Sequence, residues 1–310
     1  MTPLPFNILS AIGNTPLVQL KRIIPQHCAD IYVKLEYFNP TASYKDRMAL
    51  AIIEGAEKKG TLWKGMTVVE CTGGSTGTSL AFVCSAKGYA FKAISSDAFA
   101  KEKLKAIQLF GGDLELIPSE GGKITPDLIP KMISRAEVLA KKANTYWTKQ
   151  FTNVDALEGY RVMGNEISQQ LNKTVDVFCG AVGTAGMVMG VSSALKKLNS
   201  ATKVVILEPA TAPLISKGMK GSHKVEGIGV GMLPPLLVNL AYDEVMAIDE
   251  DAARHMARQL VTLEGIFAGT SSGMNVLAAI EIGKRLGPGH SVVTVACDSG
   301  LKYMTGGLFD

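Results

Sequence analysis

The feature that most constrains the fold is a regular alternation of short apolar runs and longer helical patterns along the chain. The runs are rich in Val and Ile, which favour strands, and span residues 31–35, 67–70, 91–95, 114–117, 175–179, 203–207 and 291–296. Helical patterns fill the gaps at residues 46–59, 79–87, 100–110, 127–142, 153–171, 188–199, 251–264 and 272–286. This order predicts an α/β fold in which helices flank open, twisted, mostly parallel sheets.

The length of the chain predicts two domains. It has 310 residues, and a single hydrophobic core usually stops growing at roughly 250–300 residues. Two Gly-rich turns from a strand into a helix, near residues 74 and 184, suggest one sheet in each domain. No linker composition marks the boundary, which we expect near residues 146–152.

Composition argues against several classes of protein. A net charge of +4 and only short basic clusters, such as Lys141-Lys142, do not indicate a nucleic-acid surface. No run of about 18 apolar residues suggests a membrane span, and residues 1–10 lack the basic start of a signal peptide, so we expect a cytoplasmic protein. The five cysteines show no metal-binding spacing, so no metal is expected, and Cys71, Cys84, Cys179 and Cys297 lie in apolar or Gly-rich runs typical of buried thiols.

The first Gly-rich turn follows the strand at 67–70 and reads Thr72-Gly73-Gly74-Ser75-Thr76-Gly77. Glycines allow a ligand to approach the backbone, while free amides and hydroxyls can bind an anion. The turn lacks the Gly-Lys-Ser/Thr sequence of a nucleotide-binding P-loop. A carboxylate is a better match for this set of hydroxyls.

The second Gly-rich turn, at residues 180–186, lies between the strand at 175–179 and the helix at 188–199. A helix that begins in such a turn is a phosphate site. Glu208, at the end of the next strand, raises the alternative of a nicotinamide dinucleotide. However, the spacing is G-x-x-G-x-x-G rather than G-x-G-x-x-G, so the residues alone leave the kind of phosphate open.

Lys45 lies where a loop enters a helix. In the first turn its positive charge opposes the helix dipole, which favours the neutral amine. A neutral amine is the form that makes a Schiff base with a carbonyl compound.

Several motifs occur together and in a fixed order. They are Ile12-Gly13-Asn14-Thr15-Pro16-Leu17-Val18, Asn39-Pro40-Thr41-Ala42-Ser43-Tyr44-Lys45-Asp46-Arg47, residues 72–77, Gln150-Phe151, Gly183-Thr184-Ala185-Gly186-Met187, residues 223–229, residues 264–273 and Asp298-Ser299-Gly300. From end to end, the sequence resembles the cysteine synthase group of fold type II pyridoxal-phosphate enzymes, which includes the cystathionine β-synthases. The resemblance implies the architecture of the tryptophan synthase β-subunit.

The resemblance also implies that the two domains have different roles. Residues 1–34 and 151–310 would form a larger domain that binds the cofactor phosphate. Residues 35–150 would form a smaller, mobile domain that carries the Schiff-base lysine and the loop for the substrate carboxylate.

The resemblance assigns individual roles as well. Lys45 would hold pyridoxal 5'-phosphate and act as the catalytic base. Ser271 would face the pyridine nitrogen, where a hydroxyl favours β-elimination over transamination. The remaining cofactor-binding residues would be Ser75, Gly183, Thr184, Ala185, Gly186 and Met187, and the substrate-binding residues Thr72, Gly73, Thr76, Gln150 and Gly229.

The implied reaction is a β-replacement on an activated serine such as O-acetylserine, through an aminoacrylate intermediate, with sulfide adding to give L-cysteine. Within the same fold, the alternatives are a synthase that forms cystathionine or diaminopropionate, and a serine/threonine dehydratase. Besides a pyridoxal-phosphate enzyme and the nicotinamide alternative, a third class is a binding protein without turnover, for example for the C-terminus of serine acetyltransferase. The family's members are usually homodimers.

Three single residues and one dipeptide depart from the family's motifs. Ser75 replaces an Asn that contacts the cofactor ring oxygen, and Gly73 replaces a Ser that helps to hold the carboxylate. Met187 replaces a Thr that donates to the phosphate, and Leu301-Lys302 replaces Glu-Arg. These changes concern the choice of substrate and nucleophile more than the binding of the cofactor.

Overall fold

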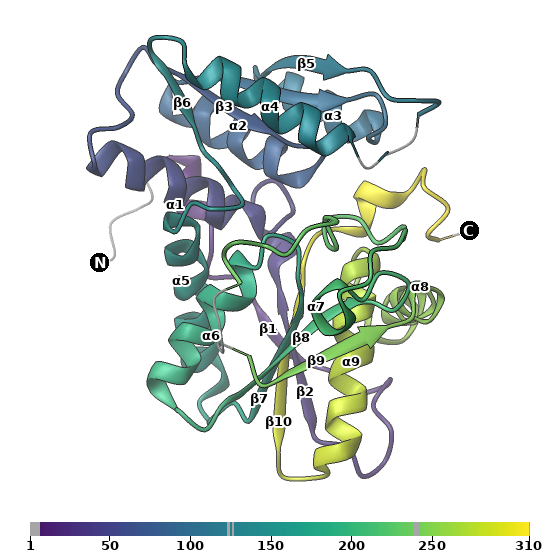
Figure 1. Ribbon diagram of the computed structural model, residues 1–310. Coiled ribbons are helices and arrows are strands. Elements are labelled where there is room, and N and C mark those ends of the chain that lie inside the picture. The colour runs from purple at the N-terminus through teal and green to yellow at the C-terminus, as the bar shows by residue number, and fades with distance from the viewer. Residues whose placement is uncertain (1–6, 123–124, 126, 238–241, 310) are drawn as a thin grey trace. The chain divides into compact units, whose positions relative to one another are not determined.

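The computed structural model describes residues 7–122, 125, 127–237 and 242–309. They form two compact units, each built around one sheet (Figure 1). The first unit contains the described residues of Met1–Ile12 and Lys45–Ala156, and the second those of Gly13–Tyr44 and Leu157–Asp310. None of the helices in these ranges has both the length and the apolar character of a membrane span. A smaller, mobile domain at residues 35–150 stays a prediction.

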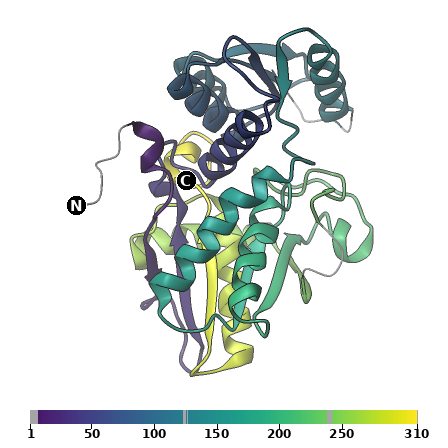
Figure 2. The ribbon, with the colours of Figure 1, turned by 90° about the vertical axis from the view of Figure 1, so that its left-hand side faces the viewer.

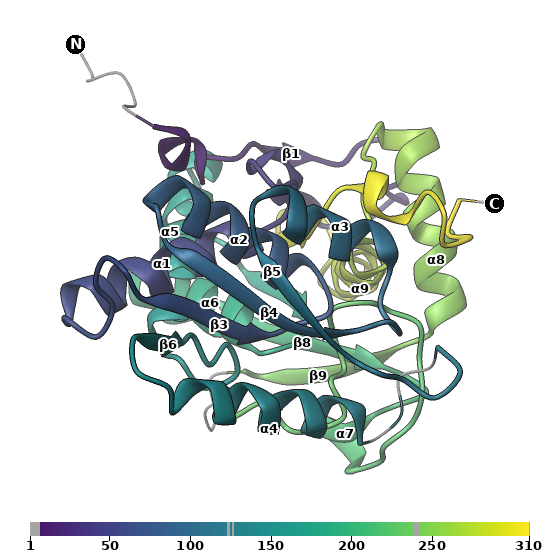
Figure 3. The same cartoon turned by 90° about the horizontal axis from the view of Figure 1, so that it is seen from above.

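The first unit has a parallel sheet of four strands in the order β5-β4-β3-β6. Its strands are β3 (Thr67–Cys71), β4 (Ala90–Ser96), β5 (Asp113–Ile117) and β6 (Thr145–Trp147). Its helices are η1 (Ile8–Ala11), α1 (Lys45–Lys58), α2 (Ser75–Lys87), α3 (Lys101–Leu109) and α4 (Leu128–Ala140). Figure 3 shows α4 on one face of the sheet and α1, α2 and α3 on the other.

The alternation of side chains along β3 explains how this sheet is covered on both faces. Val68 points toward α1 and α2 and packs with Leu80 and Ile53 in one apolar cluster. Val69, the next residue, packs with Met132 of α4 in a second cluster. A parallel sheet with apolar side chains on both faces requires helices on both faces.

The second unit has a sheet of six strands in the order β1-β2-β10-β7-β8-β9, in which only β1 is antiparallel to its neighbour. The strands are β1 (Leu17–Gln19), β2 (Asp30–Leu35), β7 (Val177–Ala181), β8 (Lys203–Pro209), β9 (Glu244–Ile248) and β10 (Ser291–Ala296). The helices are η2 (Glu36–Phe38), α5 (Asp155–Leu171), α6 (Gly186–Leu198), α7 (Leu214–Lys217), α8 (Glu250–Gln259), η3 (Leu260–Glu264), α9 (Thr270–Leu286) and η4 (Gly300–Tyr303). Figure 2 shows α5 and α6 on one face of this sheet, and α8 and α9 pack into the apolar cluster on the other.

The structure confirms the predicted α/β fold with two mostly parallel sheets and all seven predicted strands, within about two residues at their ends. It also confirms burial of the four cysteines expected to be buried, whereas Cys28 is half-buried. The sequence pattern missed β1, β6, β9 and α7, which are short and lie at or beyond sheet edges. β6 occupies the start of the region expected to be a domain boundary.

Candidate active site

The predicted site residues divide between the two units. The first unit holds Lys45, Thr72, Gly73, Ser75, Thr76 and Gln150. The second holds Gly183, Thr184, Ala185, Gly186, Met187, Gly229 and Ser271.

In the first unit, residues 72–77 form the turn between the carboxyl end of β3 and the start of α2. The helix begins at Ser75, four residues earlier than the sequence pattern predicts. The Thr72 hydroxyl explains this early start, because its oxygen accepts the amide hydrogens of Gly74 at 3.3 Å and Gly77 at 3.1 Å. The N-terminus of α2 therefore lies within the Gly-rich turn, and a helix N-terminus is a place where an anion can bind.

Two of the predicted substrate-binding residues contact each other. Thr76 Oγ1 donates a hydrogen bond to Gln150 Oε1 at 2.9 Å, although the two residues are far apart in the sequence. Gln150 Nε2 donates to the carbonyl oxygen of Cys71 at 2.8 Å. Both side chains are buried, so their orientation is fixed at the end of β3 before any ligand binds.

Glu70 supports this arrangement and was not singled out by sequence reasoning. Its carboxylate is fully buried and accepts hydrogen bonds from the amides of Cys71 at 2.8 Å and Gln150 at 2.9 Å, and from the Thr148 hydroxyl at 2.5 Å. Burial raises the pKa of Glu70 above its usual value, while these donors act in the opposite direction. An acidic residue at the end of an apolar strand was the only signal in the sequence.

The structure gives a physical reason for the glycine at position 73. A Cβ atom placed on Gly73 would lie 2.2 to 2.4 Å from three ring carbons of Phe99. The half-buried Phe99 ring therefore fills the space into which a serine side chain would extend. Phe99 is a further residue beside the turn that the sequence did not indicate.

Lys45 is the first residue of α1, and the residue is only 7% exposed. Most lysines keep their ammonium group in water, so a buried lysine in the first turn of a helix is unusual. Asp46 and Arg47, which follow it, are buried as well. Ser75 lies in the first turn of α2 and is half-buried.

In the second unit, the turn between β7 and α6 forms an anion cradle. Ala185 adopts a left-handed conformation with φ of 67° and is followed directly by Gly186, the first residue of α6. Thr184 is buried in the turn. A Cβ atom on Gly183 would lie 2.3 Å from the carbonyl oxygen of Gly227, so only glycine fits there. The first amides of α6 and the Thr184 hydroxyl suit a phosphate group.

Three further residues of the second unit lie on α6 and α9. Ser271 is the second residue of α9 and is buried, so its hydroxyl lies at a helix N-terminus. Met187 folds back over β7, since a Cβ atom on Gly180 would lie 2.9 Å from the Met187 methyl group. Asn275 was missed by sequence reasoning: its side chain accepts from the Ala181 amide and donates to the Val295 carbonyl, both at 2.8 Å, which fixes the end of β7.

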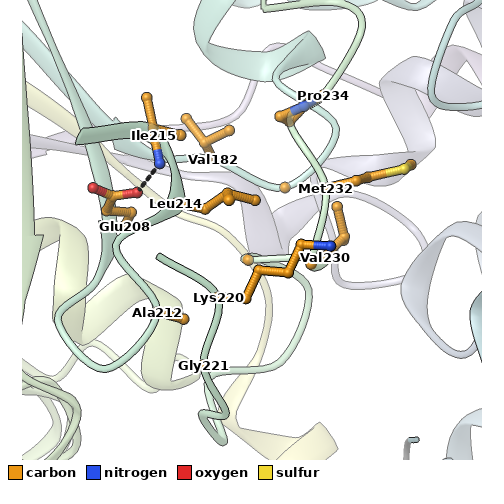
Figure 4. Close-up of a pocket in the computed structure, with 13 residues that line it drawn as sticks. Val182, Glu208, Ala212, Leu214, Ile215, Lys220, Gly221, Val230, Met232 and Pro234 are labelled. Carbon is orange, nitrogen blue, oxygen red and sulfur yellow. Dashed lines mark hydrogen bonds between the residues drawn. The ribbon is translucent and has the colours of Figure 1, made fainter. Parts of the chain in front are cut away.

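Gly229 and Gly183 line one pocket in the second unit. Figure 4 shows Glu208 at its edge, bonded to the backbone nitrogen of Ile215. The Glu208 carboxylate accepts the amide hydrogens of Ile215 at 2.6 Å and Ser216 at 3.0 Å, so it caps α7. The acidic residue that suggested a dinucleotide thus has a structural role, which removes the main support for the nicotinamide alternative.

An anion cradle at a helix N-terminus, a second Gly-rich turn with a buried amide side chain, and a buried lysine are features of a fold type II enzyme. The family model described as "Pyridoxal-phosphate dependent enzyme" matches residues 8–298, so the chain is an enzyme that uses pyridoxal phosphate. The cysteine synthase of Staphylococcus aureus is 39% identical over 305 residues, which cover 98% of this chain and 96% of that protein. The chain belongs to the cysteine synthase family.

Solved structures agree with this assignment. The crystal structure of a cysteine synthase from Entamoeba histolytica has a TM-score of 0.93 and 32% identity, and the match covers 99% of this chain and 91% of that one. The crystal structure of an O-ureido-L-serine synthase has a TM-score of 0.91 and 36% identity, with 99% and 96% covered. The predicted fold type II architecture is thereby confirmed.

Proposed function

We propose that this chain replaces the leaving group on the β-carbon of an activated serine, with O-acetylserine as donor, sulfide as nucleophile and L-cysteine as product. The observation that carries the proposal is the hydrogen-bonded pair Thr76–Gln150 at the N-terminus of α2. In this pair the second amide hydrogen of Gln150 Nε2 is available to donate to an amino-acid carboxylate beside the N-terminus of α2. The pair occurs in a chain that resembles proteins named cysteine synthases over nearly its whole length.

The residues present fit pyridoxal phosphate. Lys45 would hold the cofactor covalently through Nζ, and Ser271 would meet its ring nitrogen. The backbone amides of residues 183–187 and the Thr184 hydroxyl would bind its phosphate, in a cradle that a Cβ atom at Gly183 would fill. When bound, pyridoxal phosphate supplies an electron sink for negative charge at the substrate α-carbon.

The chain's own residues would then handle the carboxylate and the proton. The first amides of α2, together with Thr76 and Gln150, would hold the substrate carboxylate. The Lys45 amine would take the α-proton, acetate would leave the β-carbon with its bonding electrons, and sulfide would form the new carbon–sulfur bond. Lys45 would finally return a proton to the α-carbon.

We further propose a homodimer in the cytoplasm, a smaller domain at residues 35–150 that moves when substrate binds, and the C-terminal carboxylate of serine acetyltransferase as a partner. The resemblance to the cysteine synthase family supports these proposals. A C-terminal carboxylate has the same chemistry as the carboxylate of the amino-acid substrate, so it would compete with the donor.

The test compares the unmodified protein with Lys45→Ala and with Lys58→Ala, which alters an exposed lysine at the other end of the same helix. Cysteine formation from O-acetylserine and sulfide should fall about 10²- to 10⁴-fold in Lys45→Ala and stay unchanged in Lys58→Ala. A panel of serine derivatives and nucleophiles, which includes the pairs that yield O-ureidoserine and cystathionine, then shows which donor and nucleophile react fastest. If another pair reacts much faster than O-acetylserine and sulfide, the proposed donor or nucleophile is wrong.

A further inference from the structure

Two loops of the second unit pack backbone to backbone. One is the turn at residues 182–186, and the other is the segment at residues 223–229, which we call the histidine loop. The Gly229 amide donates to the Val182 carbonyl oxygen at 3.1 Å. A Cβ atom on Gly183 would lie 2.3 Å from the Gly227 carbonyl oxygen. The conformation of the proposed phosphate cradle therefore depends on where the histidine loop lies.

His223 contacts the backbone of the same glycine, Gly229. Its Nε2 lies 3.0 Å from the Gly229 carbonyl oxygen. Because a carbonyl oxygen only accepts hydrogen bonds, Nε2 carries the proton and donates it. Gly229 has a φ of 57°, and a Cβ atom there would lie 2.3 Å from His223 Nε2, so the ring is packed directly against the glycine backbone. The backbone of one residue, Gly229, thus connects His223 to the phosphate cradle.

The other ring nitrogen, Nδ1, indicates that His223 has a structural role and does not transfer protons. Nδ1 of His223 is buried and has no hydrogen-bond partner among the residues that the structure describes. A histidine that transfers protons is usually oriented by a second group on its other nitrogen. The single hydrogen bond to Gly229 indicates a ring that holds the backbone in place.

We infer that His223 is a positioning residue, which holds Gly229 against Val182 and so keeps the wall of the pocket that Gly183 and Gly229 line (Figure 4). The structural part of this inference concerns the second unit alone. Its kinetic consequence rests on the proposed function: without the hydrogen bond, the KM for the amino-acid donor rises, whereas kcat changes little.

The test uses two amides that differ by one methylene group. In His223→Gln the side-chain nitrogen can reach the position of Nε2 and donate to Gly229, whereas in His223→Asn it is too short. We expect the donor KM to rise about 5- to 50-fold in the Asn variant and to stay within about 3-fold in the Gln variant. His223→Leu, which has no donor, should match the Asn variant.

Hydrogen–deuterium exchange of the holoenzyme without substrate gives a second measurement, which does not depend on the reaction. The Gly229 amide should exchange faster in the Asn and Leu variants and at the original rate in the Gln variant. If the unmodified protein does not react with O-acetylserine, the proposed function fails, while exchange still tests His223. Equal exchange of the Gly229 amide in the unmodified, Gln and Asn proteins would overturn the inference. An equal rise of the donor KM in the Gln and Asn variants would overturn it as well.

Discussion

Replacing Gly73 with serine is expected to destabilise the protein, because Phe99 already fills the space beside the glycine. The new Cβ atom would lie 2.2 to 2.4 Å from three ring carbons of Phe99. Favourable contacts between carbon atoms occur at about 3.5–4.0 Å, so the ring or the backbone must move by more than 1 Å. Overpacking of this kind typically costs about 1–3 kcal/mol of unfolding free energy.

A double-mutant cycle measures whether the two residues share one space. Phe99→Ala alone should lose about 1–3 kcal/mol, less than a fully buried phenylalanine, because the ring is half-buried. In the Phe99→Ala background the serine has room, so Gly73→Ser should cost less than about 0.5 kcal/mol there. The unfolding free energies of all four proteins, from urea titrations monitored by circular dichroism, give the coupling energy.

Gly74→Ser is the matched control, since the nearest atom to a Cβ there is Lys103 Cδ at 3.7 Å, an ordinary contact. It should cost clearly less than Gly73→Ser. Additive effects of Gly73→Ser and Phe99→Ala would refute the reasoning, because they would mean that the ring does not occupy the space of the serine side chain.

Three further predictions concern the second unit. Gly183→Ala should weaken pyridoxal phosphate binding at least about 10-fold, measured by fluorescence titration of the apoprotein, because its Cβ would lie 2.3 Å from the Gly227 carbonyl oxygen. Ala185→Gly should raise the unfolding free energy by about 0.5–1 kcal/mol, since φ is 67° there and glycine adopts this conformation without strain; an unchanged or lower stability would contradict this. Burial opposes ionisation of the Asp243 carboxyl, but hydrogen bonds from Lys196 and from a backbone amide lower its pKa to about 2. The ionised carboxylate therefore stabilises the fold above pH 3.8, and this stabilisation is lost as the pH falls toward 2. Asp243→Asn should therefore cost about 1 kcal/mol at pH 7 and progressively less in acid, by urea titration at several pH values.

Much of the architecture followed from the sequence, because it depends on local periodicity. Apolar runs of strand length between amphipathic helices require parallel sheets with helices on both faces, and the observed sheets follow this order. The Gly-rich turns near residues 74 and 184 lie at the carboxyl ends of β3 and β7, where ligands bind in such sheets. The ordered motifs around Lys45 were sufficient to indicate the family and its cofactor.

The tertiary structure decided how the side chains of the site are arranged. Thr76 meets Gln150, and Glu70 organises the backbone of Gln150, because β6 lies beside β3, and the sequence pattern had missed β6. Phe99 lies against Gly73 because the segment after β4 returns over the end of β3. Contacts between residues distant in sequence depend on strand order and on how each helix packs against its sheet, and the local sequence pattern predicts neither. The sequence thus determined the family and the position of Lys45, while packing in three dimensions determined which residues support the site.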